Sequence, residues 1–160
     1  MNNWWRGEKG EWYVVVQFVL FGLMAFGPRE VAWLPRWQVG GEILWLVVGG
    51  LVGLGGAVLL GLGIVHLGQN LTAVPHPKTG SSLVQTGAYA IVRHPIYSGI
   101  IIGSLGWALL SRSPLMLLYA LVLLLFFDVK SRREEQWLSE KFAAYGEYQE
   151  RVKKLLPFLY

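Results

Sequence analysis

Residues 43–67 read ILWLVVGGLVGLGGAVLLGLGIVHL, a run of 25 residues in which His66 is the first titratable side chain. A helix needs about 20 mostly apolar residues to cross a membrane, so this run is long enough by itself. Three shorter apolar runs, at residues 12–26, 96–110 and 114–127, need their polar flanks to cross. The pattern predicts an all-α protein, a polytopic membrane helical bundle with about four transmembrane helices and a C-terminal amphipathic cytoplasmic helix.

The composition of the whole chain supports this class. Mean hydropathy is +0.43, and of the 160 residues 54% are hydrophobic and only 15% charged, whereas a soluble domain carries about 25% charged residues. The chain has no cysteine, which excludes disulfides, thiolate metal ligands and cysteine nucleophiles. We predict no metal site. The first residues contain two tryptophans and mixed charges, which is not typical of a cleavable signal peptide.

Lysine and arginine are unequally divided between the two sides that four spans would create. The side with both termini receives 11 of them: Arg6, Lys9, Lys78, Arg93, Lys130, Arg132, Arg133, Lys141, Arg151, Lys153 and Lys154. The other side receives three: Arg29, Arg36 and Arg112. The positive-inside rule then places both termini in the cytoplasm of a plasma or inner membrane. The net charge of +4 follows from this bias, so we predict no nucleic-acid partner.

Small residues recur every four positions in the longest run. They are Gly49, Gly53, Ala57 and Gly61. Such a face lets another membrane helix approach closely. A nucleotide-binding glycine loop is the alternative, but it requires a preceding strand and this segment lies inside an apolar run. We therefore predict helix packing through this face.

A helical hairpin should join the third and fourth runs. Only Ser111, Arg112 and Ser113 separate them before Pro114, and so short a link favours antiparallel helices. At about 1.5 Å per residue the third run rises about 21 Å and the fourth returns about 24 Å. The polar residues 130–135 should therefore lie at the height of residues 93–97.

The first of these polar clusters lies within residues 87–99, which read GAYAIVRHPIYSG. Pro95 favours an extended conformation at His94 and a helix that starts near Pro95 itself. We interpret His94 as a ligand-binding group, because it lies beside that helix start and between Tyr89 and Tyr97. Arg93 fits a site residue and an interfacial charge equally well.

The second cluster reads KSRREE at residues 130–135. Glu134 and Glu135 are about 100° apart on a helix, so only one can face a given pocket. Lys130 and Glu134 share a face and could form a solvated ion pair of little energetic value. Taken alone, the cluster fits a belt of charges at a membrane exit better than a site. The hairpin, which brings it to His94, favours a site.

The tail continues the apolar periodicity at three- and four-residue steps. Its members are Leu138, Phe142, Tyr145, Tyr148, Val152 and Leu155. This stripe predicts one helix that ends at Pro157 and that lies on the membrane or closes over a cytoplasmic pocket. Residues 69–87 are rich in proline, glycine and serine, which indicates an irregular loop.

The order of these motifs resembles the isoprenylcysteine carboxyl methyltransferase family, which overlaps the membrane phospholipid N-methyltransferases. The resemblance covers residues 65–160 and rests on RHPxY at residues 93–97, the hairpin, the Glu134-Glu135 pair and YxxY at residues 145–148. It implies a single membrane methyltransferase domain over residues 1–160. Residues 1–67 would supply two spans, and residues 68–160 would supply a cofactor-binding loop, the hairpin and the C-terminal helix.

The resemblance also implies S-adenosylmethionine as the methyl donor. The implied cofactor-binding residues are Leu83, Val84, Tyr89, His94, Pro95, Tyr97 and Glu134, and the implied catalytic residues are Lys130, Glu134 and Arg93. A sulfonium cation favours aromatic faces and carboxylates, which these positions offer. Lys130 stands where the eukaryotic members have an arginine that engages the substrate carboxylate, and a lysine lacks the bidentate fork of arginine.

The implied reaction is methyl transfer to a lipophilic acceptor at the cytoplasmic membrane face. The acceptor would be the carboxylate or amine of a lipid or isoprenoid-type amphiphile, so the expected partners are a lipophilic or lipid-modified substrate and membrane lipids. Two alternatives remain open. One is an NADPH-dependent membrane reductase of sterol-reductase type, and the other is a structural membrane protein without enzymatic activity.

Overall fold

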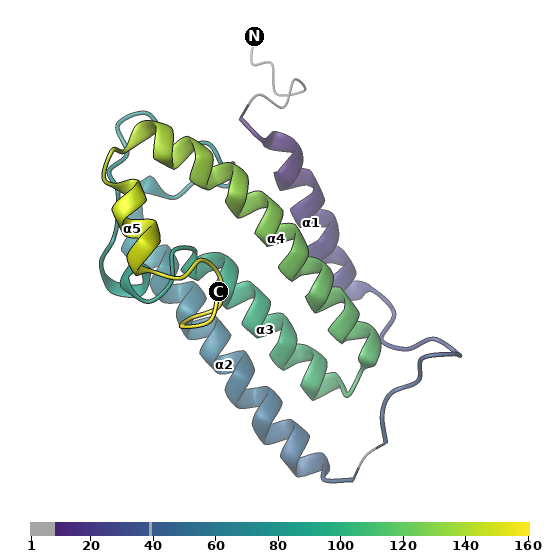
Figure 1. Cartoon of the computed structure of the whole chain (residues 1–160). Coiled ribbons are helices and arrows are strands. Elements are labelled where there is room, and N and C mark those ends of the chain that lie inside the picture. The colour runs from purple at the N-terminus through teal and green to yellow at the C-terminus, as the bar shows by residue number, and fades with distance from the viewer. Residues whose placement is uncertain (1–8, 39) are drawn as a thin grey trace.

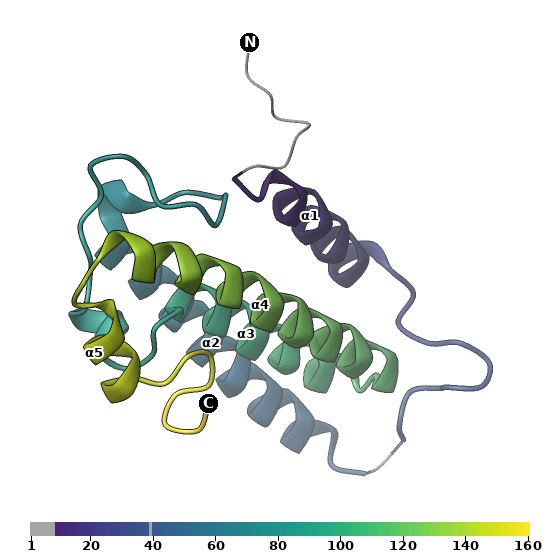
Figure 2. The same cartoon turned by 45° about the horizontal axis from the view of Figure 1, so that its top comes forward.

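A computed structural model describes residues 9–38 and 40–160 (Figure 1), so Arg6, counted above, lies outside the described residues. These parts of the chain contain five α-helices and no strand, which confirms the all-α prediction. The helices are α1 (Glu11–Phe26), α2 (Glu42–Leu67), α3 (Pro95–Ser111), α4 (Pro114–Lys141) and α5 (Tyr145–Arg151). The four long helices lie side by side in the order α1, α4, α3, α2, and α5 crosses one end of them (Figures 1 and 2).

Helices α2 and α4 are long and apolar enough to cross a membrane. Helices α1 and α3 are shorter apolar helices of 16 and 17 residues. At about 1.5 Å per residue these two reach about 25 Å, less than the hydrocarbon core of about 30 Å. The buried residues of α2 are three glycines, whereas its leucines and valines are largely exposed. This outward apolar surface is typical of a helix in lipid, and the protein is a helical membrane protein.

Glycine backbones form the contact between α2 and α3. The buried glycines Gly49, Gly56 and Gly63 are seven residues apart and so lie on one face of α2. A Cβ atom built on Gly56 would lie 2.4 Å from the backbone nitrogen of Gly103 in α3. The prediction of close helix packing is confirmed, and the predicted face is right at Gly49 and Gly53: a Cβ atom built on Gly106 of α3 would lie 2.4 Å from the Gly53 backbone nitrogen. The predicted face is wrong at Gly61, where a Cβ atom would meet nothing within 4 Å, because beyond Gly53 the contact continues through Gly56 and Gly63.

The predicted hairpin between α3 and α4 is confirmed. Arg112 adopts a left-handed conformation with φ 49° and ends α3. Ser113 caps α4 because its Oγ accepts a hydrogen bond from the backbone N–H of Met116 at 3.0 Å. Pro114 occupies the first turn of α4, where no backbone donor is needed. The hairpin returns the polar end of α4 to the start of α3, as expected.

The tail departs from the single amphipathic helix that its periodicity predicts. Helix α4 ends at Lys141, residues 142–144 are not helical, and α5 contains only seven residues. The backbone N–H of His94 donates to the carbonyl of Lys154 at 3.1 Å, so the tail pairs with the segment before α3. Tyr145, Tyr148 and Leu155 are consequently buried in the protein instead of lying on the membrane surface.

Helix α1 packs on α4 through aromatic rings and makes its main contact there. Phe21 lies 6.4 Å from Phe127, and Tyr13 lies 6.3 Å from Phe126, measured between ring centroids. The two views of the ribbon agree that α1 stands apart from α2 (Figures 1 and 2). Helix α1 is therefore joined to the other helices mainly through α4.

Candidate functional site

A cavity of about 480 Å³ lies at the polar end of the bundle. All five helices and the loop over residues 68–86 contribute to its wall. Eight of the nine predicted site residues line it: Leu83, Val84, Tyr89, Arg93, His94, Tyr97, Lys130 and Glu134. The ninth, Pro95, is buried at the first turn of α3 and fixes where that helix begins. Residues from opposite ends of the sequence thus meet at one site.

The loop wall is organised by side chains that hold its backbone. Asn70 and Ser82 bond reciprocally, with the Ser82 N–H donating to Asn70 Oδ1 at 3.3 Å and Asn70 Nδ2 donating to the Ser82 carbonyl at 3.3 Å. Leu83 and Val84 follow, and within the described residues no hydrogen bond is made by their backbone groups. Two adjacent residues therefore offer free donors and acceptors beside the cavity.

A short 3₁₀ helix, η3 (Gly87–Ala90), carries Tyr89 into the wall. His66 at the end of α2 holds it, because His66 Nδ1 accepts a hydrogen bond from the Ala88 N–H at 3.1 Å. Gly87 has φ +62°, and a Cβ atom there would lie 2.7 Å from the His66 ring. Only glycine suits this position, since it combines a left-handed backbone with close approach of a side chain.

Two tyrosines from α5 and one from η3 form the end of the cavity nearest the tail. The Tyr148 hydroxyl donates to the Tyr89 carbonyl at 2.6 Å, and the Tyr145 and Tyr148 rings lie edge to face at 5.8 Å. Burial raises the pKa of the Tyr89, Tyr145 and Tyr148 hydroxyls above the ordinary value for tyrosine. All three are therefore neutral hydrogen-bond donors near pH 7.

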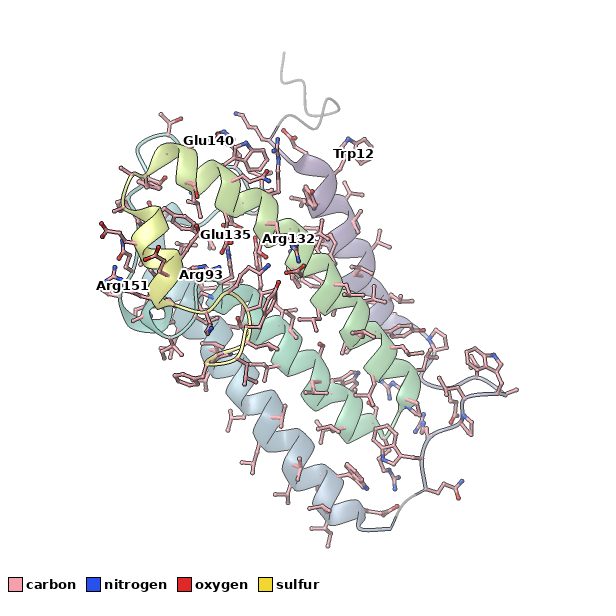
Figure 3. The ribbon with its side chains drawn as sticks, viewed as in Figure 1. Trp12, Arg93, Arg132, Glu135, Glu140 and Arg151 are labelled. Carbon is pink, nitrogen blue, oxygen red and sulfur yellow. The ribbon has the colours of Figure 1, made fainter. Side chains whose placement is uncertain are left out.

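Arg93 joins three segments of the chain. Its Nε donates to Glu135 Oε1 at 2.7 Å, and its NH1 donates to the carbonyls of Gln149 and Val152. The side chains of Arg93 and Glu135 are each 10% exposed, and Figure 3 labels both where the start of α3 meets α4 and α5. Most of the hydrogen-bonding capacity of this guanidinium is used inside the protein, so Arg93 holds the tail against α4.

His94, Tyr97 and Glu134 form a linked group on the cavity wall. The His94 ring stacks on Tyr97 at 5.4 Å with an interplanar angle of 7°, and Tyr97 stacks on Phe127 at 4.6 Å. The Tyr97 hydroxyl donates to Glu134 Oε2 at 2.7 Å. His94 Nε2 lies 3.1 Å from Glu135 Oε1, while His94 Nδ1 is 3.8 Å from Glu134. Of the adjacent glutamates, Glu134 faces the cavity and Glu135 holds Arg93 and His94.

Lys130 is buried on the same wall, with 1% exposure. Its Nζ donates to Gln17 Oε1 at 2.6 Å and to the Ala73 carbonyl at 3.1 Å, and it lies 5.1 Å from the centroid of the Tyr97 ring. The solvated Lys130–Glu134 ion pair considered from the sequence is not formed: the lysine is buried and bonds to neutral oxygens instead. Its environment is a protein interior rather than a membrane-exit belt.

Gln17 is a residue of this site that the sequence interpretation missed, and Tyr145 and Tyr148 were also not among the predicted site residues. Gln17 lies on α1, and its side chain both lines the cavity and accepts from Lys130. A signal was available, because Gln17 is the single amide or charged side chain in residues 12–26. A polar residue inside an apolar helix usually faces the protein interior, which would have pointed α1 toward the site.

The arrangement suits an organic ligand that has both polar and apolar parts. The wall includes the Glu134 carboxylate, two lysines (Lys78 and Lys130), four tyrosines and the unpaired backbone groups, together with aliphatic side chains from α2 and α3. Within the described residues, no group of three His, Asp or Glu side chains is placed to hold a metal ion. Small-molecule pockets commonly combine such apolar walls with a few fixed polar groups.

Comparison with known proteins adds independent information. The family profile described as phospholipid methyltransferase matches residues 44–145, from α2 to the start of α5. The rice protein named "Probable protein-S-isoprenylcysteine O-methyltransferase" (Oryza sativa subsp. indica) is 34% identical over 108 residues, covering 65% of this chain and 56% of the rice protein. The Saccharomyces cerevisiae protein-S-isoprenylcysteine O-methyltransferase is 35% identical over 117 residues, covering 63% of this chain and 49% of the yeast protein.

A bacterial relative extends over nearly the whole chain. The cobalt-zinc-cadmium resistance protein CzcN of Cupriavidus metallidurans is 30% identical over 156 residues, covering 96% of this chain and 65% of that protein. The chain thus spans about half to two thirds of the length of the curated relatives that it matches. The profile match contains the loop, the hairpin and every predicted site residue. This chain therefore belongs to the phospholipid methyltransferase family.

Proposed function

We propose that the protein is an S-adenosylmethionine-dependent methyltransferase that acts on a lipophilic acceptor at the cytoplasmic face of a membrane. The observation that carries the proposal is that eight of the predicted site residues line one cavity. This cavity lies between helices whose outer surfaces are apolar. Membership of the phospholipid methyltransferase family supports it. The names of the rice and yeast relatives support an isoprenylcysteine-type acceptor, that is, the carboxylate of a lipid-modified group.

The residues on the cavity wall fit this methyl donor. The volume of about 480 Å³ is within the range of about 300–1,000 Å³ for small-molecule sites. Glu134 presents a carboxylate to the cavity with one oxygen held by Tyr97, which suits a ligand that bears an ammonium group or a ribose. The free backbone groups of Leu83 and Val84 suit a nucleobase edge. When bound, the donor supplies an electrophilic methyl group on a sulfonium.

The chain contributes alignment and exclusion of water. Glu134 is fixed by the Tyr97 hydroxyl, and His94 is fixed between Glu135 and the Tyr97 ring, so both cavity groups are held in one geometry. Arg93 is best regarded as a positioning residue, because it fastens α5 and its tyrosines over the cavity through Glu135 and the carbonyl of Gln149. Such preorganisation lowers the barrier of a displacement reaction in which two bound groups must be aligned.

We also propose that all four long helices enter the bilayer, with α1 and α3 using polar flanks. The excess of lysine and arginine at the cavity end of the bundle supports a cytoplasmic position for the cavity and for both termini. The acceptor would be a lipid-soluble or lipid-modified molecule that enters with its tail among the apolar helices. Carboxylate and amine acceptors are both compatible with methyl transfer of this kind.

Calorimetry on detergent-purified protein tests the proposal. We expect wild type to bind S-adenosylmethionine and S-adenosylhomocysteine, but not NADPH. Glu134→Gln should weaken both methyl-cycle ligands about 10- to 100-fold, the value of a hydrogen bond to a charged group. Glu140→Gln is the matched control, because Glu140 is exposed on the same helix and outside the cavity, and it should bind like wild type. Binding of NADPH alone would support the reductase alternative, and binding of no ligand by folded protein would refute the proposal.

A further inference from the structure

The ammonium of Lys130 is buried among neutral partners. Two of its three N–H donors are used, one by the amide oxygen of Gln17 at 2.6 Å and one by the carbonyl of Ala73 at 3.1 Å. Lys130 and Gln17 both line the cavity. A lysine ammonium has three donors, so one donor is left for a group inside the cavity.

The described residues give this cation no ion-pair partner, although the Glu134 carboxylate one turn further along α4 acts on it electrostatically. Among the described residues, no carboxylate lies within 4.0 Å of Lys130 Nζ. Glu134, one turn further along α4, accepts from the Tyr97 hydroxyl, and Glu135 pairs with Arg93. An isolated buried charge is unfavourable, and the cost is recovered when an opposite charge binds beside it. The cavity is therefore prepared for an anion at Lys130.

The neutral side chain of Gln17 leaves Lys130 without an ion-pair partner on α1. A glutamate there would have almost the same shape and would still accept from Lys130, but it would neutralise the ammonium. Glutamine provides the acceptor without the charge, so it positions Lys130 and leaves its electrostatic field directed to the cavity. Gln17 lies on α1, outside the residues 44–145 that match the family profile, so the matched region does not supply this contact.

We propose that Gln17 is a specificity-determining positioning residue, which holds Lys130 as a cation without an ion-pair partner so that the acceptor subsite takes an anionic amphiphile and rejects a cationic one. This deepens the proposed function and rests on it. Transfer to a carboxylate would form one O–CH₃ bond, break one S–CH₃ bond and release no proton, converting an anion and a sulfonium into two neutral groups. An ammonium-bearing acceptor would meet the Lys130 charge at close range, which disfavours its binding.

The test compares two probes with the same chain length and opposite head groups, decanoate and decyltrimethylammonium. Their binding to full-length protein in a non-ionic detergent is measured by calorimetry, with S-adenosylhomocysteine binding and thermal unfolding recorded on the same samples. We expect wild type to prefer decanoate by at least about tenfold, the effect of one favourable charge contact of about 1.4 kcal/mol. Gln17→Glu should remove that preference in protein that still binds S-adenosylhomocysteine, with an unfolding temperature at or above that of wild type because the new carboxylate lies beside the buried ammonium.

Further variants keep the test decisive. Gln136→Glu adds the same charge at an exposed position of α4 and should retain the preference for decanoate. Lys130→Met should bind both probes alike. If Gln17→Glu fails to fold, Gln17→Met replaces it: it removes the hydrogen bond without adding charge and should lower decanoate affinity only. The inference would be overturned if Gln17→Glu kept the wild-type preference for decanoate, or if Gln17→Met kept it where that variant is used instead. Equal binding of both probes to wild type would also overturn it. If folded wild-type protein does not bind S-adenosylhomocysteine, the proposed function itself is refuted.

Discussion

The contact between α2 and α3 is made by backbone atoms, whereas the contact between α1 and α4 is made by side chains. The first is made by glycine backbones, with Gly56 so close to Gly103 that no Cβ atom fits between them. The second is made by side chains, mainly aromatic rings and the Gln17–Lys130 hydrogen bond. A contact between backbones tolerates no change, whereas a contact between side chains can be adjusted residue by residue. The rigid pair positions the cavity, and the adjustable helix borders the end where the acceptor is proposed to bind.

The substitution Gly56→Leu should break the rigid contact and have the largest effect. Its Cβ atom would lie 2.4 Å from the Gly103 nitrogen and 2.7 Å from the Gly99 carbonyl oxygen, and neither backbone atom can rotate away. We expect more than the typical overpacking loss of about 1–3 kcal/mol, seen as aggregation in size-exclusion chromatography or a large fall in unfolding temperature. Gly50→Leu is the control on the same helix, because its Cβ atom would meet nothing within 4 Å. Equal behaviour of the two variants would show that α2 does not depend on this glycine face.

The substitution Arg93→Met tests whether losing a side-chain contact can destabilise the protein nearly as much as losing a backbone contact. It leaves Glu135 buried without its guanidinium partner. Removing one partner of a buried ion pair typically costs about 3–5 kcal/mol, and the tail should also detach from α4. Thermal unfolding and protease sensitivity of residues 145–160 report the two effects. Arg133→Met, which removes an exposed arginine whose hydrogen bond to Gln136 stays within α4, should change neither.

The substitution Phe21→Ala tests the contact between α1 and α4, and we expect it to cause the smallest loss of stability of the three. It removes one ring from the α1–α4 contact with Phe127, a pair worth about 0.5–1.5 kcal/mol beyond its buried area. The unfolding temperature should fall slightly, and hydrogen exchange should increase in α1 but not in α2. Val19→Ala, at a position 65% exposed, is the control. A loss as large as that of Gly56→Leu would mean that α1 is as rigidly integrated as α3.

Much of this architecture could be predicted from local patterns. The three-residue link and Pro114 determine the hairpin, and the hairpin brings Glu134 to Tyr97, where their hydrogen bond is 2.7 Å. Helix lengths and side-chain direction follow from simple geometry, so two polar clusters far apart in sequence could be placed at one height. The residues that the family resemblance implied as site residues consequently line one cavity or, as Pro95 does, support it.

What could not be predicted depends on how helices cross and how the chain folds back. The four-residue and seven-residue repeats of small residues both start at Gly49, and spacing does not say that the contact with α3 includes Gly53 but then continues through Gly56 and Gly63. The apolar stripe of the tail is compatible with one long helix, but hydrogen bonds from the backbone of Arg93 and His94 to Lys153 and Lys154 fold it against α3. Gln17 was missed because its partner, Lys130, lies 113 positions away in the sequence.

The backbone pairing of the tail also sets the order in which the site can be made. Tyr145 and Tyr148 close the cavity, and the segment after them is tied to the residues just before α3 by N–H groups and by the Ser98 hydroxyl, which donates to the Leu155 carbonyl at 2.5 Å. These residues leave the ribosome after all four long helices have been synthesised. The cavity can therefore be completed only after all four long helices have been synthesised, because its last wall residues come from the end of the chain.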